Sequence, residues 1–147
     1  MRKPKVIEIE LEKHFRFMYS NFVISSQQQL YLLLALKEYD IDVLVFDFSV
    51  YKYGYPNDEV GHPLMKYGLG IYGFYEVLNS KWVEKLRINN SFHCRHSDEI
   101  FNKKKHYVAK FKDVTLEVIS YNYELKTLSK SFFSNMLNEQ FKYLDDD

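Results

Sequence analysis

Residues 106 to 121 carry apolar side chains at every second position on either side of a Lys112-Asp113 pair. If that pair forms a two-residue turn, one face of the resulting hairpin carries three apolar pairs, Phe111/Val114, Ala109/Leu116 and Tyr107/Val118. The other face carries the mixed pairs Lys110/Thr115, Val108/Glu117 and His106/Ile119. Because successive side chains of a strand point to opposite faces, this segment predicts an antiparallel hairpin with one face on the core.

Other segments also show the patterns of strands. From Val6 to Glu12, apolar residues alternate with glutamates, which is typical of a half-exposed strand. Strands are also predicted at residues 15–24, 41–50 and 74–78. The strand at 41–50 is apolar on both faces, as expected for a strand in the middle of a covered sheet. Residues 51–73 contain all five glycines of the chain and are predicted to be irregular.

Four helices are predicted. The segment Gln27–Glu38 is apolar nearly all round and follows a capping-box spacing, so it is predicted as a buried helix in the N-terminal half. Asn79-Ser80 and Ser97 are predicted to start two short helices. After Thr127 a C-terminal amphipathic helix is predicted to dock through an apolar stripe, made of Leu128, Phe132, Met136, Leu137, Phe141 and Leu144. The elements together predict an α+β fold with a largely antiparallel sheet.

The length and composition fit one globular domain. The chain has 147 residues, of which 46% are hydrophobic and 27% are charged, so a single domain over residues 1–147 is predicted and disorder is excluded. The 20 basic and 20 acidic residues cancel, which argues against binding of nucleic acid through a basic surface. No apolar run approaches the ~20 residues of a membrane-spanning helix. The lone Cys94 leaves no internal disulfide, so a cytoplasmic protein is expected.

The neutral total hides two regions of opposite charge. Residues 16–60 hold 3 basic and 6 acidic residues, a net charge of −3, whereas residues 61–126 hold 11 basic and 7 acidic residues, a net charge of +4. The acidic region ends in a predicted loop rich in tyrosine and acid, namely Tyr51, Tyr53, Tyr55, Asp58 and Glu59. Tyrosine is common at the centres of protein interfaces, so this loop is predicted to bind a basic protein partner. The alternative is that these rings close the edge of the core with their hydroxyls outward.

Histidines form the main chemical cue. His93 and His96 are three residues apart and His106 follows ten residues later, and imidazole is a good zinc ligand. A single pair of this kind is not a specific zinc signature, so the pattern does not require a cofactor. Zinc is the metal that a site made of these histidines would take. The pattern favours histidines that hold loops by hydrogen bonds, and a metal site and a catalytic pair are the alternatives. We predict His93, His96 and His106 as candidate metal ligands.

The segment from His62 to Tyr121 carries a longer pattern. Its residues are His62-Pro63-Leu64, Asn79-Ser80-x-Trp82, Asn89, His93, His96, His106-Tyr107 and Phe111-x-Asp113-x-Thr115-x-Glu117. This pattern resembles a family of small uncharacterised bacterial proteins with no assigned activity. The resemblance implies an ordered domain and draws attention to His62 and the three histidines above, but it implies no catalytic roles. The first 60 residues lie outside it.

Three functions remain open from the sequence. The first is a non-enzymatic protein-binding domain, of the immunity type that neutralises a bacterial toxin, since the chain has an acidic, tyrosine-rich segment and none of the common catalytic motifs. The second is a metal-dependent hydrolase or nuclease that uses His93 and His96, with Asp98 or Glu99 as base. The third is a subunit that associates with copies of itself. The sequence favours the first and thus a protein that is not an enzyme.

Overall fold

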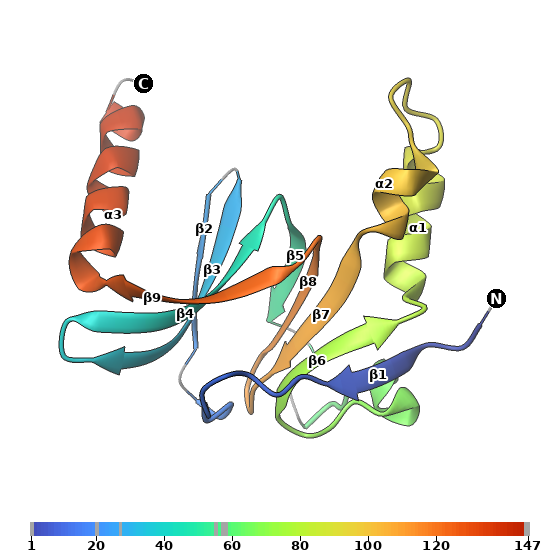
Figure 1. The fold of residues 1–147 in the computed structure, drawn as a ribbon, viewed down its shortest axis with the longest axis horizontal. Helices are drawn as coiled ribbons and strands as arrows, with labels where there is room; N and C mark the ends of the chain where they lie inside the picture. Colours follow the sequence, from blue (N-terminus) through green and yellow to red (C-terminus); the bar gives the residue numbers. More distant parts are fainter. Residues whose placement is uncertain (1, 20, 27, 55, 57–58, 146–147) are drawn as a thin grey trace.

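The computed structural model describes residues 2–19, 21–26, 28–54, 56 and 59–145. The strands are β1 (Lys5–Glu8), β2 (Phe22–Ser25), β3 (Gln29–Lys37), β4 (Asp40–Asp47), β5 (Val50–Gly54), β6 (Gly73–Leu78), β7 (Lys105–Lys110), β8 (Thr115–Ser120) and β9 (Tyr123–Ser129). The helices are the 3-10 helix η1 (Pro63–Tyr67) and the α-helices α1 (Lys81–Asn90), α2 (Asp98–Asn102) and α3 (Lys130–Asp145). Figure 1 shows α3 at one end of the molecule and α1 with α2 at the other, with the strands between them.

The strands form two antiparallel sheets that pack face to face. The five-stranded sheet has the order β1-β6-β7-β8-β5 and the four-stranded sheet the order β2-β3-β4-β9. Their inner faces form the main core, whose buried members are Leu30, Leu32, Leu34, Leu44, Phe46, Phe74, Tyr107, Ala109, Phe111, Leu116 and Val118. The predicted α+β class with antiparallel pairing is confirmed, but the strands are divided between two sheets. Each sheet also has an outer face, on which η1 packs in the five-stranded sheet and the start of α3 packs in the four-stranded sheet.

The hairpin predicted at residues 106–121 is confirmed as β7 and β8. The two strands pair with Ala109 opposite Leu116 and Tyr107 opposite Val118, and these four side chains are buried in the main core. The N–H of Phe111 donates to the carbonyl of Val114 at 3.0 Å, which closes the turn between the strands. The mixed face of the hairpin, opposite to the core, becomes part of the outer face of the five-stranded sheet.

The buried helix predicted at Gln27–Glu38 is wrong, because the structure has the strand β3 there. β3 lies between β2 and β4, and its leucines at 30, 32 and 34 face the main core. On its other face Tyr31 and Leu33 belong to a second apolar cluster, which includes Phe133 of α3. A strand that is buried on both faces is apolar nearly all round, just like a buried helix, so the pattern could not distinguish them. The Ser26 Oγ does accept the N–H of Gln29 at 3.2 Å, but this contact closes a turn before β3.

Other boundaries differ in the same region. β1 is shorter than the predicted 6–12 strand, and only β2 forms within the predicted 15–24 strand. Phe15 and Phe17 still pack against the main core from irregular backbone. The segment 51–73 is not wholly irregular, since it contains most of β5 and all of η1. The predicted middle strand is confirmed as β4, and the short helices are confirmed as α1 and α2, with Ser80 and Ser97 at their N-caps.

The C-terminal helix α3 is confirmed, but its apolar stripe is not docked along its length. Phe133 is 5% exposed and packs against Tyr31 of β3, with ring centres 5.7 Å apart. Farther along the helix Leu137, Phe141 and Leu144 are exposed. The docked ring, Phe133, lies outside the predicted stripe, and Phe132 of that stripe is exposed. Of the predicted residues, Met136 and Leu128 do pack against the cluster of Phe133, but Leu128 belongs to β9. No helix in the described ranges is long and apolar enough to cross a membrane.

Candidate functional site

The outer face of the five-stranded sheet carries a buried cluster of polar side chains from distant parts of the chain. His106 lies on β7 and Glu117 on β8, on the mixed face of the hairpin. His62 lies immediately before η1. The two histidine side chains are each 4% exposed, and the Glu117 side chain is 12% exposed. A carboxylate at such a position is stable only if its oxygens are hydrogen-bonded.

Each carboxylate oxygen of Glu117 has a histidine partner. Nε2 of His62 lies 3.0 Å from Oε2, and Nε2 of His106 lies 2.8 Å from Oε1. The Nδ1 of His62 accepts the backbone N–H of Leu64 at 3.0 Å, so the ring proton of neutral His62 is on Nε2 and is donated to Glu117. Burial favours the uncharged carboxyl, but the hydrogen bonds from His106 and His62 outweigh burial and lower the pKa of Glu117 to about 2. Glu117 is therefore ionised at neutral pH.

The same cluster holds two helices against the sheet. His62 caps η1 through its bond from the Leu64 N–H. Ser80 caps α1, because its Oγ accepts the N–H of Val83 at 3.1 Å, and the same Oγ lies 2.7 Å from Nδ1 of His106. A helix N-terminus has backbone N–H groups without partners in the helix, and polar side chains commonly satisfy them. The cluster thus links both helix starts to β7 and β8.

Hydrogen bonds link Ser80 to His106 and His106 to Glu117, which is the order of serine, histidine and acid in the triad of serine hydrolases. In that class, the Nε2 atom of the histidine faces the serine and Nδ1 faces the acid. Here Nδ1 faces Ser80 and Nε2 faces Glu117, which reverses the ring. The Ser80 oxygen is also occupied by the Val83 N–H as a helix cap. The geometry accounts for Ser80 as a structural cap better than as a nucleophile.

The cluster also lacks the donor chemistry of a metal centre. A histidine nitrogen ligates a metal through a free lone pair, and Nε2 of His62 carries the ring proton as long as Nδ1 caps η1. Glu117, which would be the carboxylate ligand, already accepts from both rings. These three residues therefore form a charge-assisted hydrogen-bond network, in which the carboxylate is the acceptor.

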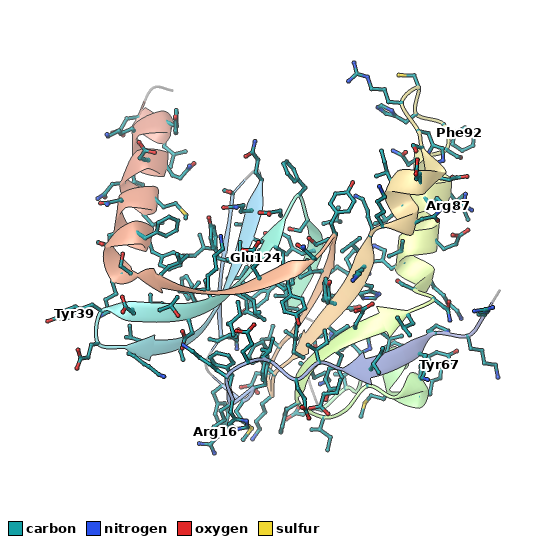
Figure 2. All side chains as sticks on the ribbon, viewed as in Figure 1. Arg16, Tyr39, Tyr67, Arg87, Phe92 and Glu124 are labelled. Carbon is teal, nitrogen blue, oxygen red and sulfur yellow. The ribbon has the colours of Figure 1, made fainter. Side chains whose placement is uncertain are left out.

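A pocket of about 840 Å³ lies over this network. Trp82 of α1 and Tyr67 of η1 contribute aromatic walls, and His62, His106 and Glu117 also line it. The Trp82 ring packs edge-on against His106, with ring centres 5.3 Å apart. Tyr67 projects from η1 beside β1, where it packs against the apolar cluster around Val6 (Figure 2).

Lysines surround the aromatic walls of this pocket. The Nζ of Lys52, on β5, lies 4.1 Å from the centre of the Trp82 ring. The Nζ atoms of Lys66 and Lys81 lie 5.2 Å and 5.9 Å from the centre of the Tyr67 ring. Ammonium groups at these distances are attracted by the negative face of an aromatic ring. The pocket is therefore basic and aromatic at its walls.

The structure separates the predicted metal ligands. His93 and His96 lie in the connection between α1 and α2, near the tip where Figure 2 labels Phe92. His93 accepts the Arg95 N–H at 3.0 Å through Nδ1, and His96 contacts Asn90 Oδ1 at 2.8 Å and Asp98 Oδ1 at 2.7 Å. His106 belongs to the buried network instead. Within the described residues, no group of three or more His, Cys, Asp or Glu is arranged to hold a metal ion.

The predicted partner-binding tyrosines lie on a strand rather than in a loop. Tyr51 and Tyr53 are on β5, which is the last strand of its sheet, and they are 39% and 45% exposed. The Tyr53 hydroxyl is hydrogen-bonded to Asn21, next to β2 at the edge of the other sheet. Two further exposed aromatic rings, Tyr19 and Phe22, flank Asn21. We call Tyr19, Phe22, Tyr51 and Tyr53 the aromatic edge. Glu59 is exposed, and Tyr55 and Asp58 lie outside the described residues.

Reasoning from single residues missed the acid and the cap of the buried network. Glu117 appeared only as one polar member of a hairpin face, and Ser80 only as a helix start. A signal was present in the sequence pattern from His62 to Tyr121. Five residues of that pattern meet in the structure, namely His62, Ser80, Trp82, His106 and Glu117.

Comparison of this chain with protein-family models, with curated proteins and with solved structures finds no match. The candidate functional features therefore come from the geometry alone, and they are the aromatic edge and the basic, aromatic pocket.

Proposed function

We propose that this chain is a non-enzymatic binding protein of the immunity type, which neutralises a bacterial toxin by binding it. The observation that carries the proposal is the exposed edge strand β5 with its two tyrosines. The Tyr53 hydroxyl of β5 is hydrogen-bonded to Asn21, which stands between the exposed Tyr19 and Phe22 in the sequence. Large rings from β5 and from the start of β2 therefore gather at one edge of the molecule. Gathered exposed aromatic groups are typical of surfaces that bind proteins.

β5 is suited to accept a strand from a partner. Four of its five residues are exposed, and in the described part of the chain it pairs with β8 alone. Natural edge strands are usually protected by an outward lysine, a proline or a bulge. The lysine of this strand, Lys52, lies instead over Trp82 on the outer face of the sheet. A partner strand can therefore pair with β5 and place its side chains against Tyr51 and Tyr53.

The charge of this region favours a basic partner. Residues 16–60, which include β2 to β5, carry a net charge of −3. Opposite charges on two proteins speed their encounter and exclude wrong partners, even where they add little affinity. A basic toxin domain is a partner of this kind.

The buried network supports a binding protein over an enzyme. The polar atoms that resemble a catalytic triad are used to cap α1 and η1 and to hold Glu117. The runner-up, a metal-dependent hydrolase, would need His93 and His96 to act with a further ligand, and their partners in the structure are Arg95, Asn90 and Asp98.

The proposal is tested by growth rescue and direct binding with the product of the gene next to the one that encodes this chain. A bacterial strain that expresses that product should stop growing and should recover when this chain is co-expressed. The variant Tyr51→Ser/Tyr53→Ser should lose rescue and bind roughly 100-fold more weakly by calorimetry, since two central aromatic residues are removed.

The matched control is Tyr39→Ser/Tyr143→Ser. Both tyrosines are also exposed. Tyr39, labelled in Figure 2, lies at the β3–β4 turn, and Tyr143 lies near the end of α3. Rescue should be intact in this variant. If the neighbouring product is harmless or does not bind, the immunity role is wrong; if both double variants bind equally well, β5 is not the interface.

A further inference from the structure

We propose that the pocket between η1, α1 and the outer face of the five-stranded sheet is a binding site for a small aromatic anion. The size of the pocket, about 840 Å³, is within the range of roughly 300–1,000 Å³ that is common for small-molecule sites. Its walls, its floor and its charges each contribute to the choice of ligand.

The walls favour a flat ligand. Trp82 and Tyr67 come from two different helices and face the same space, with Leu64, Met65 and Val77 among the apolar residues beside them. Aromatic rings bind planar groups by offset stacking or edge-to-face contact, which adds to the gain from simple burial. A ligand with one or two fused rings fits this lining.

The charges favour an anion. Three lysines line the pocket, Lys52, Lys66 and Lys81, and each ammonium lies within 6 Å of an aromatic ring centre. An acidic group on a stacked ligand would therefore lie within reach of one or more ammonium groups, where the bond is charge-assisted. Among the described lining residues, the single acid is Glu117.

The floor removes the main objection to an anion. An unpaired carboxylate below the pocket would repel a second negative group. Both oxygens of Glu117, however, accept hydrogen bonds from His62 and His106, so N–H dipoles oppose its charge on both sides. The histidine rings stand at the pocket lining together with Glu117. The lysines are thus the groups left to determine which charge the pocket prefers.

This site is independent of the proposed partner surface. Tyr51 and Tyr53 do not line the pocket and face the other side of the β5 strand from Lys52. Loss of binding at one site therefore leaves the other to be measured separately.

The experiment uses Trp82 as a reporter, because it is the only tryptophan in the chain. The probes are 8-anilinonaphthalene-1-sulfonate and its uncharged analogue N-phenyl-1-naphthylamine, which share the ring system and differ in the sulfonate. Excitation of Trp82 should give energy transfer to the sulfonate probe in a saturable titration. The uncharged probe should bind at least tenfold more weakly.

Lysine substitutions then test the charges. Each of Lys52→Met, Lys66→Met and Lys81→Met should weaken the sulfonate probe by up to about fivefold, and the triple variant by roughly 50-fold, as expected for partly exposed ion pairs. Affinity for the uncharged probe should stay within twofold. The matched control is Lys85→Met, which is one turn from Lys81 on α1 and does not line the pocket.

Three results would overturn the proposal. The first is saturable binding of the sulfonate probe without energy transfer from Trp82, which would locate it on another surface. The second is equal affinity for the charged and uncharged probes. The third is a triple variant that melts at the wild-type temperature and binds the sulfonate probe as well as the wild type does.

Discussion

Replacement of Glu117 by glutamine tests how much the buried network stabilises the fold. Glutamine has the shape of the protonated, uncharged glutamic acid, so Glu117→Gln reproduces the neutral form at every pH. In the folded protein, hydrogen bonds from His106 and His62 lower the pKa of Glu117 from its ordinary value of 4.5 to about 2. Because one pKa unit corresponds to about 1.4 kcal/mol, the ionised form is favoured by roughly 3 kcal/mol. Glu117→Gln should lower the free energy of unfolding at pH 7 by that amount.

The pH dependence gives the sharper test. The folded-state pKa is lower than the unfolded one, so the stabilisation is complete above about pH 4.5 and is lost as the pH falls toward 2. In urea denaturation followed by circular dichroism, the difference between the wild type and Glu117→Gln should shrink from roughly 3 kcal/mol at pH 7 to near zero at pH 2.

The control is Glu124→Gln on β9. Its side chain is 57% exposed and its ion pair with Lys126 is 3.3 Å long, so the change should be within about 0.5 kcal/mol at every pH. The reasoning is refuted if Glu117→Gln is as stable as the wild type at pH 7, or if its deficit is the same at pH 7 and pH 2.

Further substitutions test the helix starts and the C-terminal helix. Ser80→Ala should lower the unfolding free energy by about 1–2 kcal/mol. Ser97→Ala should change it by less than about 0.5 kcal/mol, because Ser97 makes no side-chain capping bond. Equal effects of the two substitutions in urea melts would contradict the role of Ser80. Phe133→Ala should cost about 3 kcal/mol and Phe141→Ala less than about 0.5 kcal/mol, since their side chains are 5% and 57% exposed. If the exposed end of α3 joins copies of this chain, light scattering should show an oligomer that Phe141→Ser dissociates; a monomer at all concentrations would exclude self-association.

The β7–β8 hairpin shows what local sequence could predict. Its strands are adjacent in the chain and one face is apolar at every second residue, so the full register followed once a two-residue turn was placed at Lys112-Asp113. The start of α1 at Ser80 was also local, because a capping side chain acts on backbone only three residues away.

β3 and α3 show where local patterns were insufficient. The leucine run of β3 is compatible with a buried helix or a doubly covered strand, and its pairing with β2 and β4 decided between them. The apolar stripe of α3 predicted a helix correctly, but not how far that helix would lie on the sheet. Both questions depend on which distant surface is available for packing.

The sequence by itself determined the α+β class, the hairpin register and the starts of the short helices, because these depend on spacing within a few residues. Only the tertiary structure decided that His62 and His106 meet at Glu117, that Lys52 lies over Trp82, and that Tyr51 and Tyr53 stand on an edge strand. His62 and Glu117 are 55 residues apart in the chain, and no local spacing carries information about such a contact. It arises because η1 and α1 pack on the outer face of the sheet, and the polar groups that they bury there need partners.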